Sequence, residues 1–247
     1  MSLTLMPMPL RIGADQRSTA RAPTKRRYDR GAAMAYAKAF WDRHCSDGYV
    51  AVKKRGTPPY REVEPGEQFL DAGVDGKEAA IHATEGQIPW ADLDDCAHFV
   101  SCCVGRPYDT TQIRPMLQTN PGLKPADAPR VPAGGLNVRS TEGVGSQWVY
   151  GIVGAPRLVS FLGQPAIGTV TARRLPALDP RLEAAVDLLQ RGDVIAMANE
   201  RDYTHVVLYN GDRGVLCHTR CRDSEHWRMN TLAYYTCIHI HDEIPGP

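Results

Sequence analysis

The chain has no long apolar segment and almost no net charge. No apolar run in its 247 residues approaches the roughly 18–20 residues that a helix needs to span a bilayer, so we expect no membrane span. Lysine and arginine total 29 against 28 acidic residues, a formal net charge of +1. That balance gives no electrostatic footprint for nucleic acid. No internal repeat is evident, and the apolar fraction of 43% is ample for a globular core.

The cysteines do not follow the pattern of a disulfide scaffold. There are seven, an odd number, and Cys102 and Cys103 are adjacent. We therefore expect synthesis in a reducing compartment. Residues 1–10 contain two prolines and no basic residue, which makes a poor signal peptide. The sequence thus predicts cytoplasmic synthesis, with a specialised secretion system as the route of any export.

Composition divides the chain into an arm and one domain. Residues 1–26 are rich in arginine and poor in apolar side chains, which predicts a disordered basic arm. A solvated tail is the simplest interpretation, and a transit peptide or a cleavable or recruiting arm is the alternative. Residues 27–247 are predicted to form the domain. Its proline- and glycine-rich part, at about 106–165, is expected to be an irregular insertion, either a lid or groove wall or a plain surface excursion.

Residues 94–103 carry the clearest chemical signal, a cysteine at the start of a predicted helix. Asp95 is a favoured N-cap residue, because its carboxylate can accept a backbone N–H of the first turn. Phe99 and Cys103 recur at helical spacing and should face a core. Cys96 would then lie where backbone N–H groups lack partners and the helix dipole is positive. That position favours the nucleophilic thiolate and offers an oxyanion site.

Three segments downstream have the pattern of β-strands: 192–197, 204–209 and 215–219. Residues 210–214 between the last two predict a hairpin turn. His205 lies on the second strand and His218 on the third. A thiol nucleophile needs an imidazole within hydrogen-bond reach, and that imidazole needs an orienting group. We therefore assign Cys96 as nucleophile, His205 as general base and His218 as its orienting partner, with Asp223 or Glu225 as alternatives for the last role.

Two other residues on these elements are interpreted as structural. Asp193 stands at the turn before the strand at 192–197, where we expect it to pin the strand rather than take part in chemistry. Cys103 lies on the interior side of the predicted helix, where a free cysteine usually packs as a small apolar residue.

Taken in order, these segments resemble the NlpC/P60 papain-like cysteine peptidases, and most closely their amidase branch. The similarity extends over roughly residues 28–104 and 190–230. It is carried by Tyr-Asp-Arg…Tyr-Ala at 28–37, Asp-Cys…Phe-Val at 95–100, Gly-Asp-Val-Ile at 192–195, His-Val-Val at 205–207 and His218. Ala97 and His98 replace the usual Thr-Asn of that branch, and Cys102 replaces its usual Gln.

The resemblance implies an α+β fold of the papain-like, NlpC/P60 type, in which a cysteine-bearing helix packs on an antiparallel β-sheet that carries the histidines. It also implies amide hydrolysis through a thioester, without a cofactor, on the stem peptides of peptidoglycan. Asp95, His98 and Trp90 flank the nucleophile and are the candidate substrate-binding residues. An antibacterial effector would meet this substrate through a secretion system, with an immunity protein as a partner.

Other functions stay open from the sequence. The same chemistry serves enzymes that modify proteins, such as a deamidase, a transglutaminase or a protease for a ubiquitin-like tag. A catalytically idle binding module on the same fold is the non-enzymatic alternative.

The rival constellation is a zinc site. Cys217, His218, Cys221 and His226, with one cysteine from 96–103, offer ligands of the zinc type. The chain has no Cys-x-x-Cys pair, however, and three residues separate Cys217 from Cys221. We therefore expect no metal.

Overall fold

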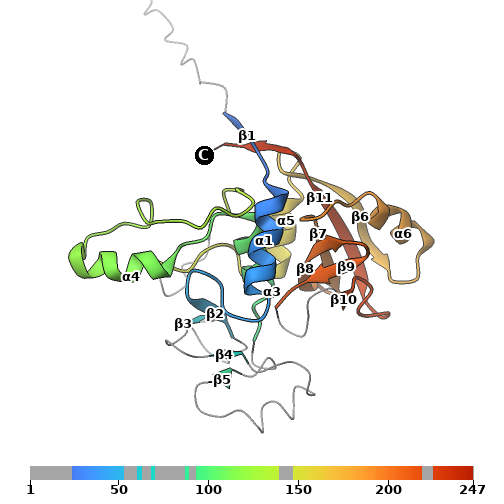
Figure 1. Cartoon of the computed structure of the whole chain (residues 1–247). Helices are drawn as coiled ribbons and strands as arrows, with labels where there is room; N and C mark the ends of the chain where they lie inside the picture. The colour runs from blue at the N-terminus through green and yellow to red at the C-terminus, as the bar shows by residue number, and fades with distance from the viewer. Residues whose placement is uncertain are drawn as a thin grey trace, which may run out of the picture.

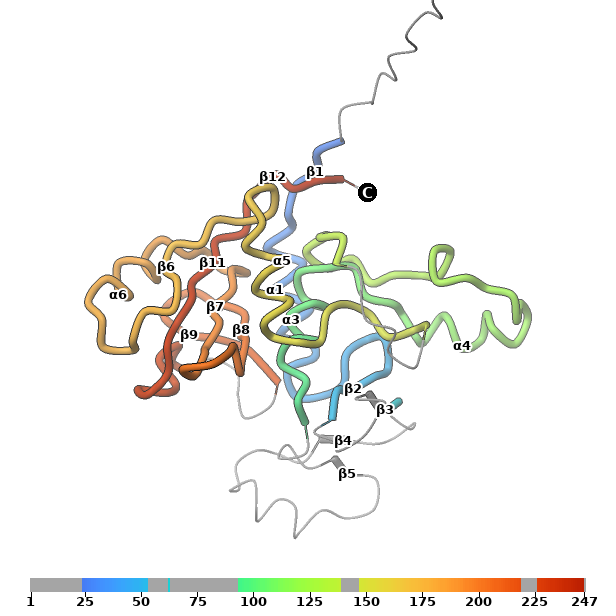
Figure 2. Tube along the Cα trace, turned by 180° about the vertical axis from the view of Figure 1, so that it is seen from behind, coloured from blue at the N-terminus to red at the C-terminus, as the bar shows by residue number. Residues whose placement is uncertain are grey.

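The computed structural model describes residues 24–52, 60–62, 68–69, 87–88, 93–138, 147–218 and 225–246. Over these ranges the chain is an α+β fold, built on a six-stranded sheet with helices on both faces (Figure 1; Figure 2). The predicted α+β class and the antiparallel sheet are confirmed.

The six strands follow one another across the sheet as antiparallel neighbours. In sheet order they are β10 (Glu225–His226), β9 (Gly214–Leu216), β8 (Tyr203–Gly211), β7 (Val194–Ala198), β11 (Tyr234–Ile240) and β6 (Gly168–Pro176). Between β8 and β9, Gly211, Asp212 and Arg213 all have positive φ, as the predicted hairpin turn requires. The three strands expected in this region are confirmed, with shifted ends.

The helices cover the two faces of the sheet unequally. On one face lie α1 (Arg30–Phe40), α3 (Cys96–Val104) and α5 (Ala155–Leu162), and on the other lies α6 (Pro180–Asp187) (Figure 1). Among the described residues, no helix combines the length and the apolar character that crossing a membrane would need.

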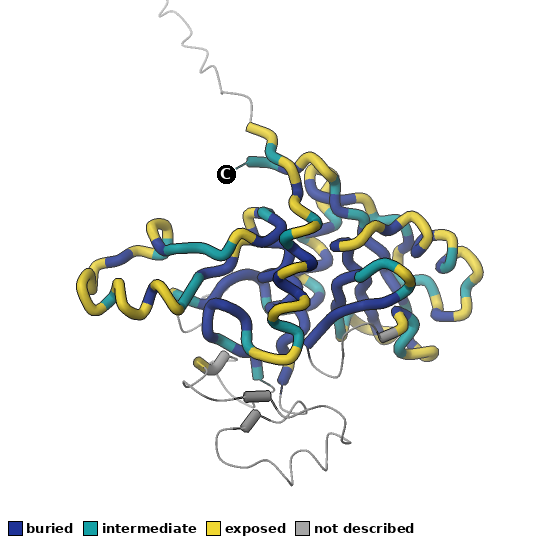
Figure 3. The backbone as a smooth tube through the Cα atoms, viewed as in Figure 1, coloured by how far each residue is buried: buried dark blue, intermediate teal, exposed yellow. Residues whose placement is uncertain are grey.

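Strand β7 shows why both faces are covered, because all five of its residues are buried (Figure 3). Successive side chains on a strand point to opposite faces. Val194 and Ala196 accordingly join the core beneath α3, whereas Ile195 and Met197 join the core beneath α6. The central strand therefore separates two apolar layers, and α3 is held against the sheet by the first of them.

Short strand pairs lie outside this sheet. β1 (Lys25–Arg27) pairs with β12 (Glu243–Pro245), β2 (Tyr49–Ala51) pairs with β3 (Tyr60–Glu62), and β4 (Gln68–Phe69) runs parallel to β5 (Gln87–Ile88). The basic arm predicted to end at residue 26 is therefore wrong at its boundary. Lys25 and Arg26 pair with β12 as a short antiparallel ladder. The sequence does not reveal this pairing, because β12 lies at the other end of the chain. Residues 1–23 lie outside the described residues.

The region predicted as an irregular insertion contains two helices. Besides α5, residues Thr110–Thr119 form α4, a largely exposed helix that extends from the body of the protein (Figure 3). Asp109 caps it by accepting the backbone N–H of Thr111 at 3.1 Å. Pro115 lies inside the helix, where it removes one intrahelical hydrogen bond. The prediction was wrong here because the helix carries a proline and is flanked by loop-forming residues.

Asp193 has the structural role that the sequence predicts. Its carboxylate is fully buried. Oδ1 accepts from Arg30 Nη1 at 2.5 Å and from the Ile240 N–H at 3.0 Å, and Oδ2 accepts from the Gln190 N–H at 2.7 Å and His239 Nδ1 at 2.8 Å. One side chain thus joins the start of α1, the entry to β7 and the end of β11.

Replacing Asp193 with Asn should destabilise the fold by about 3 kcal/mol, because the Arg30 guanidinium would lose its buried countercharge. Urea unfolding measures the change. Asp242→Asn is the matched control, since Asp242 also pairs with Arg30 but its side chain is 60% exposed. The control should lose less than about 1 kcal/mol. Equal losses in the two variants would contradict the role given to Asp193.

Candidate active site

Cys96 is the first residue of α3 and lies where that helix meets β8. The side chain is 3% exposed. A hydrogen bond from the backbone N–H of Val206 reaches its sulfur. Standard bond lengths place that nitrogen within about 2.5 Å of the Cα of His205. The predicted nucleophile therefore lies against the peptide unit that joins the predicted base to the next residue.

His205 occupies β8 opposite Met197 and is half-buried. By strand alternation its side chain leaves the strand on the face opposite Val206, which packs on the α3 side. The pairing register shifts directly beside it, between Met197 and Ala198, so β8 carries an extra residue there. Such a bulge re-aims nearby side chains. The structure therefore brings the backbone beside His205 to Cys96 but not the imidazole, which leaves β8 on the face shared with Met197. Proton transfer would require the strand at the bulge to reorient this side chain toward Cys96.

The Cys96 thiol is protonated at neutral pH. Burial raises its pKa to about 12, the charges of Asp94 and Asp95 add to the rise, and backbone hydrogen bonds from Val206 and Ala97 oppose it. The prediction that the helix N-terminus favours the thiolate is wrong, because burial outweighs the dipole. Attack by this sulfur consequently needs a base that removes its proton.

Asp95 is the N-cap residue of α3 by position, but its carboxylate makes no capping hydrogen bond to the helix. Its Oδ1 accepts from the Ala51 N–H at 2.5 Å and from His98 Nδ1 at 2.9 Å, and its Oδ2 accepts from His218 Nδ1 at 2.6 Å. The Asp95 carboxylate faces the imidazolium of His98, whereas a first-turn N–H is a neutral donor, which explains why the predicted capping bond is not made. The carboxylate therefore leaves the first-turn N–H groups uncapped.

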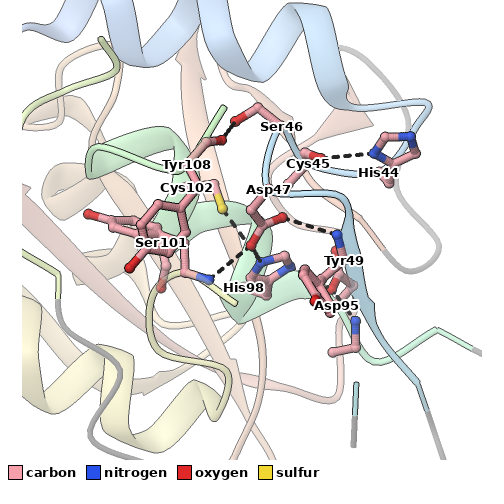
Figure 4. Close-up of polar contacts among 12 residues, drawn as sticks. His44, Cys45, Ser46, Asp47, Tyr49, Asp95, His98, Ser101, Cys102 and Tyr108 are labelled. Carbon is pink, nitrogen blue, oxygen red and sulfur yellow. Dashed lines mark hydrogen bonds and ion pairs between the residues drawn. The ribbon is translucent and has the colours of Figure 1, made fainter. Parts of the chain in front are cut away.

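A second carboxylate continues this network into the interior. Asp47 Oδ2 lies 2.9 Å from His98 Nε2 and accepts the Tyr150 N–H at 2.9 Å. Figure 4 shows His98 facing Asp47 and Cys102 from the first turns of α3. Asp47, Asp95, His98 and His218 are all fully buried. Sequence reasoning missed Asp47, because it stands far from the cysteine helix in the chain and belongs to no recognised motif.

His218 is held by two acceptors. Its Nδ1 bonds Asp95, its Nε2 lies 2.7 Å from the Phe40 carbonyl oxygen, and its ring stacks on Phe99 with centroids 4.1 Å apart. Both ring nitrogens are therefore engaged, one by the carboxylate and the other by the carbonyl. The expected role of His218, accepting the ring N–H of His205, does not fit this geometry. It instead ties the segment after β9 to the start of α3, through Asp95, and to the end of α1, through Phe40.

The three candidate substrate-binding residues are Asp95, His98 and Trp90. Asp95 and His98 are fully buried and their polar atoms are engaged with each other and with neighbours, so neither is presented to a substrate in this structure. The expectation for them is corrected for that reason. Trp90 and Asp223 lie outside the described residues, as does the side chain of Glu225.

The structure does not support the zinc site considered from the sequence, which used Cys217, His218, Cys221 and His226. Cys217 takes part in a disulfide, which removes it as a thiolate ligand. Both ring nitrogens of His218 are engaged, one with Asp95 and the other with the Phe40 carbonyl. Cys221 lies outside the described residues.

Comparison with family models, with curated proteins and with solved structures finds no match to this chain. The description of the site therefore rests on its geometry alone.

The charges of the network bias protonation in opposite directions. For Asp95, burial alone would raise the pKa, but the charge of His98 and the hydrogen bonds from His218 and His98 outweigh it and lower the pKa to about 2. For His98, burial alone would lower the pKa, but Asp47 and Asp95 outweigh it and hold the pKa well above its usual range. The carboxylate and the imidazolium thus coexist at neutral pH.

The depressed pKa of Asp95 predicts a specific loss of stability in acid. The folded value is about 2 against an ordinary value of 3.8. The stabilisation, about 2 kcal/mol, is complete above pH 4 and disappears as the pH falls toward 2. Urea unfolding across pH 2–5 measures it. Asp95→Asn should flatten this pH dependence, while Asp94→Asn, an exposed neighbour, should keep the wild-type slope. A wild-type slope in Asp95→Asn would refute the assignment.

Proposed function

We propose that the chain is a cysteine-dependent amide hydrolase with Cys96 as nucleophile and His205 as general base. The observation that carries the proposal is the position of the Cys96 sulfur, at the uncapped start of α3 and hydrogen-bonded to the N–H that follows His205. The resemblance to NlpC/P60 papain-like peptidases supports the same two residues, and the packing of α3 across an antiparallel sheet is compatible with that fold.

The state of the thiol determines the order of steps. Because Cys96 is protonated, His205 removes the proton as the sulfur attacks the substrate carbonyl. The carbonyl oxygen becomes an oxyanion, which the first-turn N–H groups of α3 can bind because Asp95 does not cap them. The imidazolium then gives its proton to the leaving amine, and a thioester remains. Water, deprotonated by His205, hydrolyses the thioester, releases the acid and restores the thiol.

In this proposal His218 is a positioning residue. It shares Asp95 with His98 and therefore fixes the N-terminus of α3 against the end of β9. The helix tip that bears Cys96 is thus held from both sides, by α1 through Phe40 and by the sheet through β9. Rigid support of this kind keeps a nucleophile and its oxyanion donors in register.

The substrate proposed is a peptide stem of peptidoglycan, on the strength of the resemblance, with delivery by a secretion system and an immunity protein as partner. Modification of a protein side chain or terminus uses the same steps and is the second candidate. Incubation with purified muropeptides followed by mass analysis distinguishes the two, because only the first predicts a cleaved stem peptide. A catalytically idle module would release no product from either substrate.

Cys96→Ala should lower kcat/KM on the cleaved substrate by at least about 10⁴-fold, because no other group on α3 replaces the nucleophile. Cys237→Ala is the matched control. Cys237 is equally buried and burial raises its pKa to about 12 as well, but it lies in the core on the α6 face. The control should retain activity. Turnover by Cys96→Ala would disprove the mechanism.

His205→Gln should lower kcat by about 10²–10⁴-fold and abolish the imidazole-dependent rise of rate with pH. The amide keeps the size and polarity of the ring but cannot accept the thiol proton at neutral pH. His226→Gln, an exposed histidine of β10, should leave the pH–rate profile unchanged. If His205→Gln retained the wild-type pH profile, another group would be the base.

A further inference from the structure

A second group of reactive side chains lies behind the nucleophile, on the interior side of α3. The side chains of Cys45, His98 and Cys102 are fully buried, and one ligand atom from each lies within 4.8 Å of the others. Figure 4 shows the sulfur of Cys102 directed at the His98 ring. In the proposed hydrolase none of these three groups touches the substrate, and an apolar core needs none of them.

The spacing of these atoms matches tetrahedral zinc. His98 and Cys102 stand four residues apart on α3 and therefore project from the same side of the helix. Cys102 Sγ lies 3.6 Å from His98 Nε2. Zinc bonds of about 2.3 Å to sulfur and about 2.0–2.1 Å to nitrogen, at a tetrahedral angle, separate the two ligand atoms by about 3.5 Å. The helix thus presents two ligands at the distance that the ion requires.

We propose that Cys45, His98 and Cys102 bind a structural zinc ion, and that Asp47, which lies outside this three-atom cluster, turns its carboxylate to supply the fourth ligand. Asp47 Oδ2 lies 2.9 Å from Nε2 of His98 and accepts the proton that the ion would replace, so the carboxylate is adjacent to the site and must shift to bind the ion. All four residues are buried, which leaves no open coordination site for substrate. A closed site of this composition is structural rather than catalytic.

The surroundings of His98 select the correct ring nitrogen. Its Nδ1 donates to Asp95 at 2.9 Å, an arrangement typical of zinc-binding histidines, whose second nitrogen is held by a carboxylate. Nε2 is thereby directed at the cysteines and Asp47. In the metal-free protein a proton on Nε2 bridges to Asp47. On binding, His98 releases this proton, Cys45 and Cys102 release theirs, and the divalent ion replaces them.

The other two ligands come from one tight turn. The Gly48 N–H donates to the Cys45 carbonyl at 2.9 Å, and Gly48 has a φ of +78°. This turn brings Cys45 and Asp47 to the same side of α3 before any ion binds. A helix with two ligands and a turn with two ligands, far apart in sequence, would be joined by the metal.

An overlapping group, Cys45 with Asp95 and His218, also satisfies the distance criterion. It is the weaker candidate, because Asp95 Oδ2 and His218 Nδ1 are only 2.6 Å apart and bonded to each other. Cys45 belongs to both groups. The proposed site excludes Cys96, so its zinc content can be measured separately from hydrolase activity.

The test is the zinc content of the full chain, purified without chelator in the presence of a reductant and measured by inductively coupled plasma mass spectrometry. We expect about one zinc per chain. Cys102→Ser should reduce this to below about a tenth. Cys103→Ser is the matched control, since Cys103 is adjacent on the same helix and equally buried but belongs to neither ligand group. Cys96→Ala should also retain the ion.

Cobalt substitution of the wild-type chain decides the question even if a variant fails to fold. Tetrahedral cobalt with two thiolate ligands gives strong visible bands and a sulfur-to-metal charge-transfer band, and we expect both. The proposal is overturned if the wild type binds no zinc, if the cobalt spectrum lacks the thiolate bands, or if Cys103→Ser loses zinc as completely as Cys102→Ser. It is also overturned if peptide mass spectrometry finds Cys45 and Cys102 joined as a disulfide.

Discussion

The arrangement of the whole site depends on one buried carboxylate. Asp95 accepts hydrogen bonds from His98 on one side and His218 on the other, and a third from the N–H of Ala51. These partners come from α3, from the end of β9 and from β2, so the single side chain joins segments that are distant in sequence. Leaving such a carboxylate without its imidazoles would leave a buried charge uncompensated, which is far more costly than losing a surface ion pair.

This arrangement has a chemical consequence at the helix tip. An aspartate at the N-cap normally satisfies a first-turn N–H, and the sequence predicts that it would do so here. Because the Asp95 carboxylate bonds the two histidines, it makes no capping bond at the first turn, where Cys96 stands and the Ala97 N–H bonds its sulfur. The same diversion sets the acid–base state of the sulfur. Burial and two nearby carboxylates favour the neutral thiol, so the proposed mechanism removes the proton during attack rather than starting from a thiolate.

Periodicity and turn residues in the sequence predict the individual strands and the cysteine-bearing helix. Alternation and the glycine turn at 210–214 predict β7, β8 and β9, and helical spacing that ends at Gly105 predicts α3. Proline-rich composition conceals α4, because Pro115 lies within the helix itself. The partners of His98 and His218 are set by tertiary contacts. Asp47 and Cys45 reach α3 only when the chain folds back on itself, and no spacing rule connects them to Cys96.

The position of His98 links the two centres proposed for this protein. One ring nitrogen binds the carboxylate that supports the nucleophile's helix tip, and the other faces the cysteines and Asp47. A metal on Nε2 would keep the proton on Nδ1 and so strengthen the bond to Asp95. Without metal, that imidazole carries two protons and is balanced by two carboxylates. In either state Asp95 stays ionised and fixed, so the geometry at Cys96 depends on the network behind it rather than on the cysteine's own contacts.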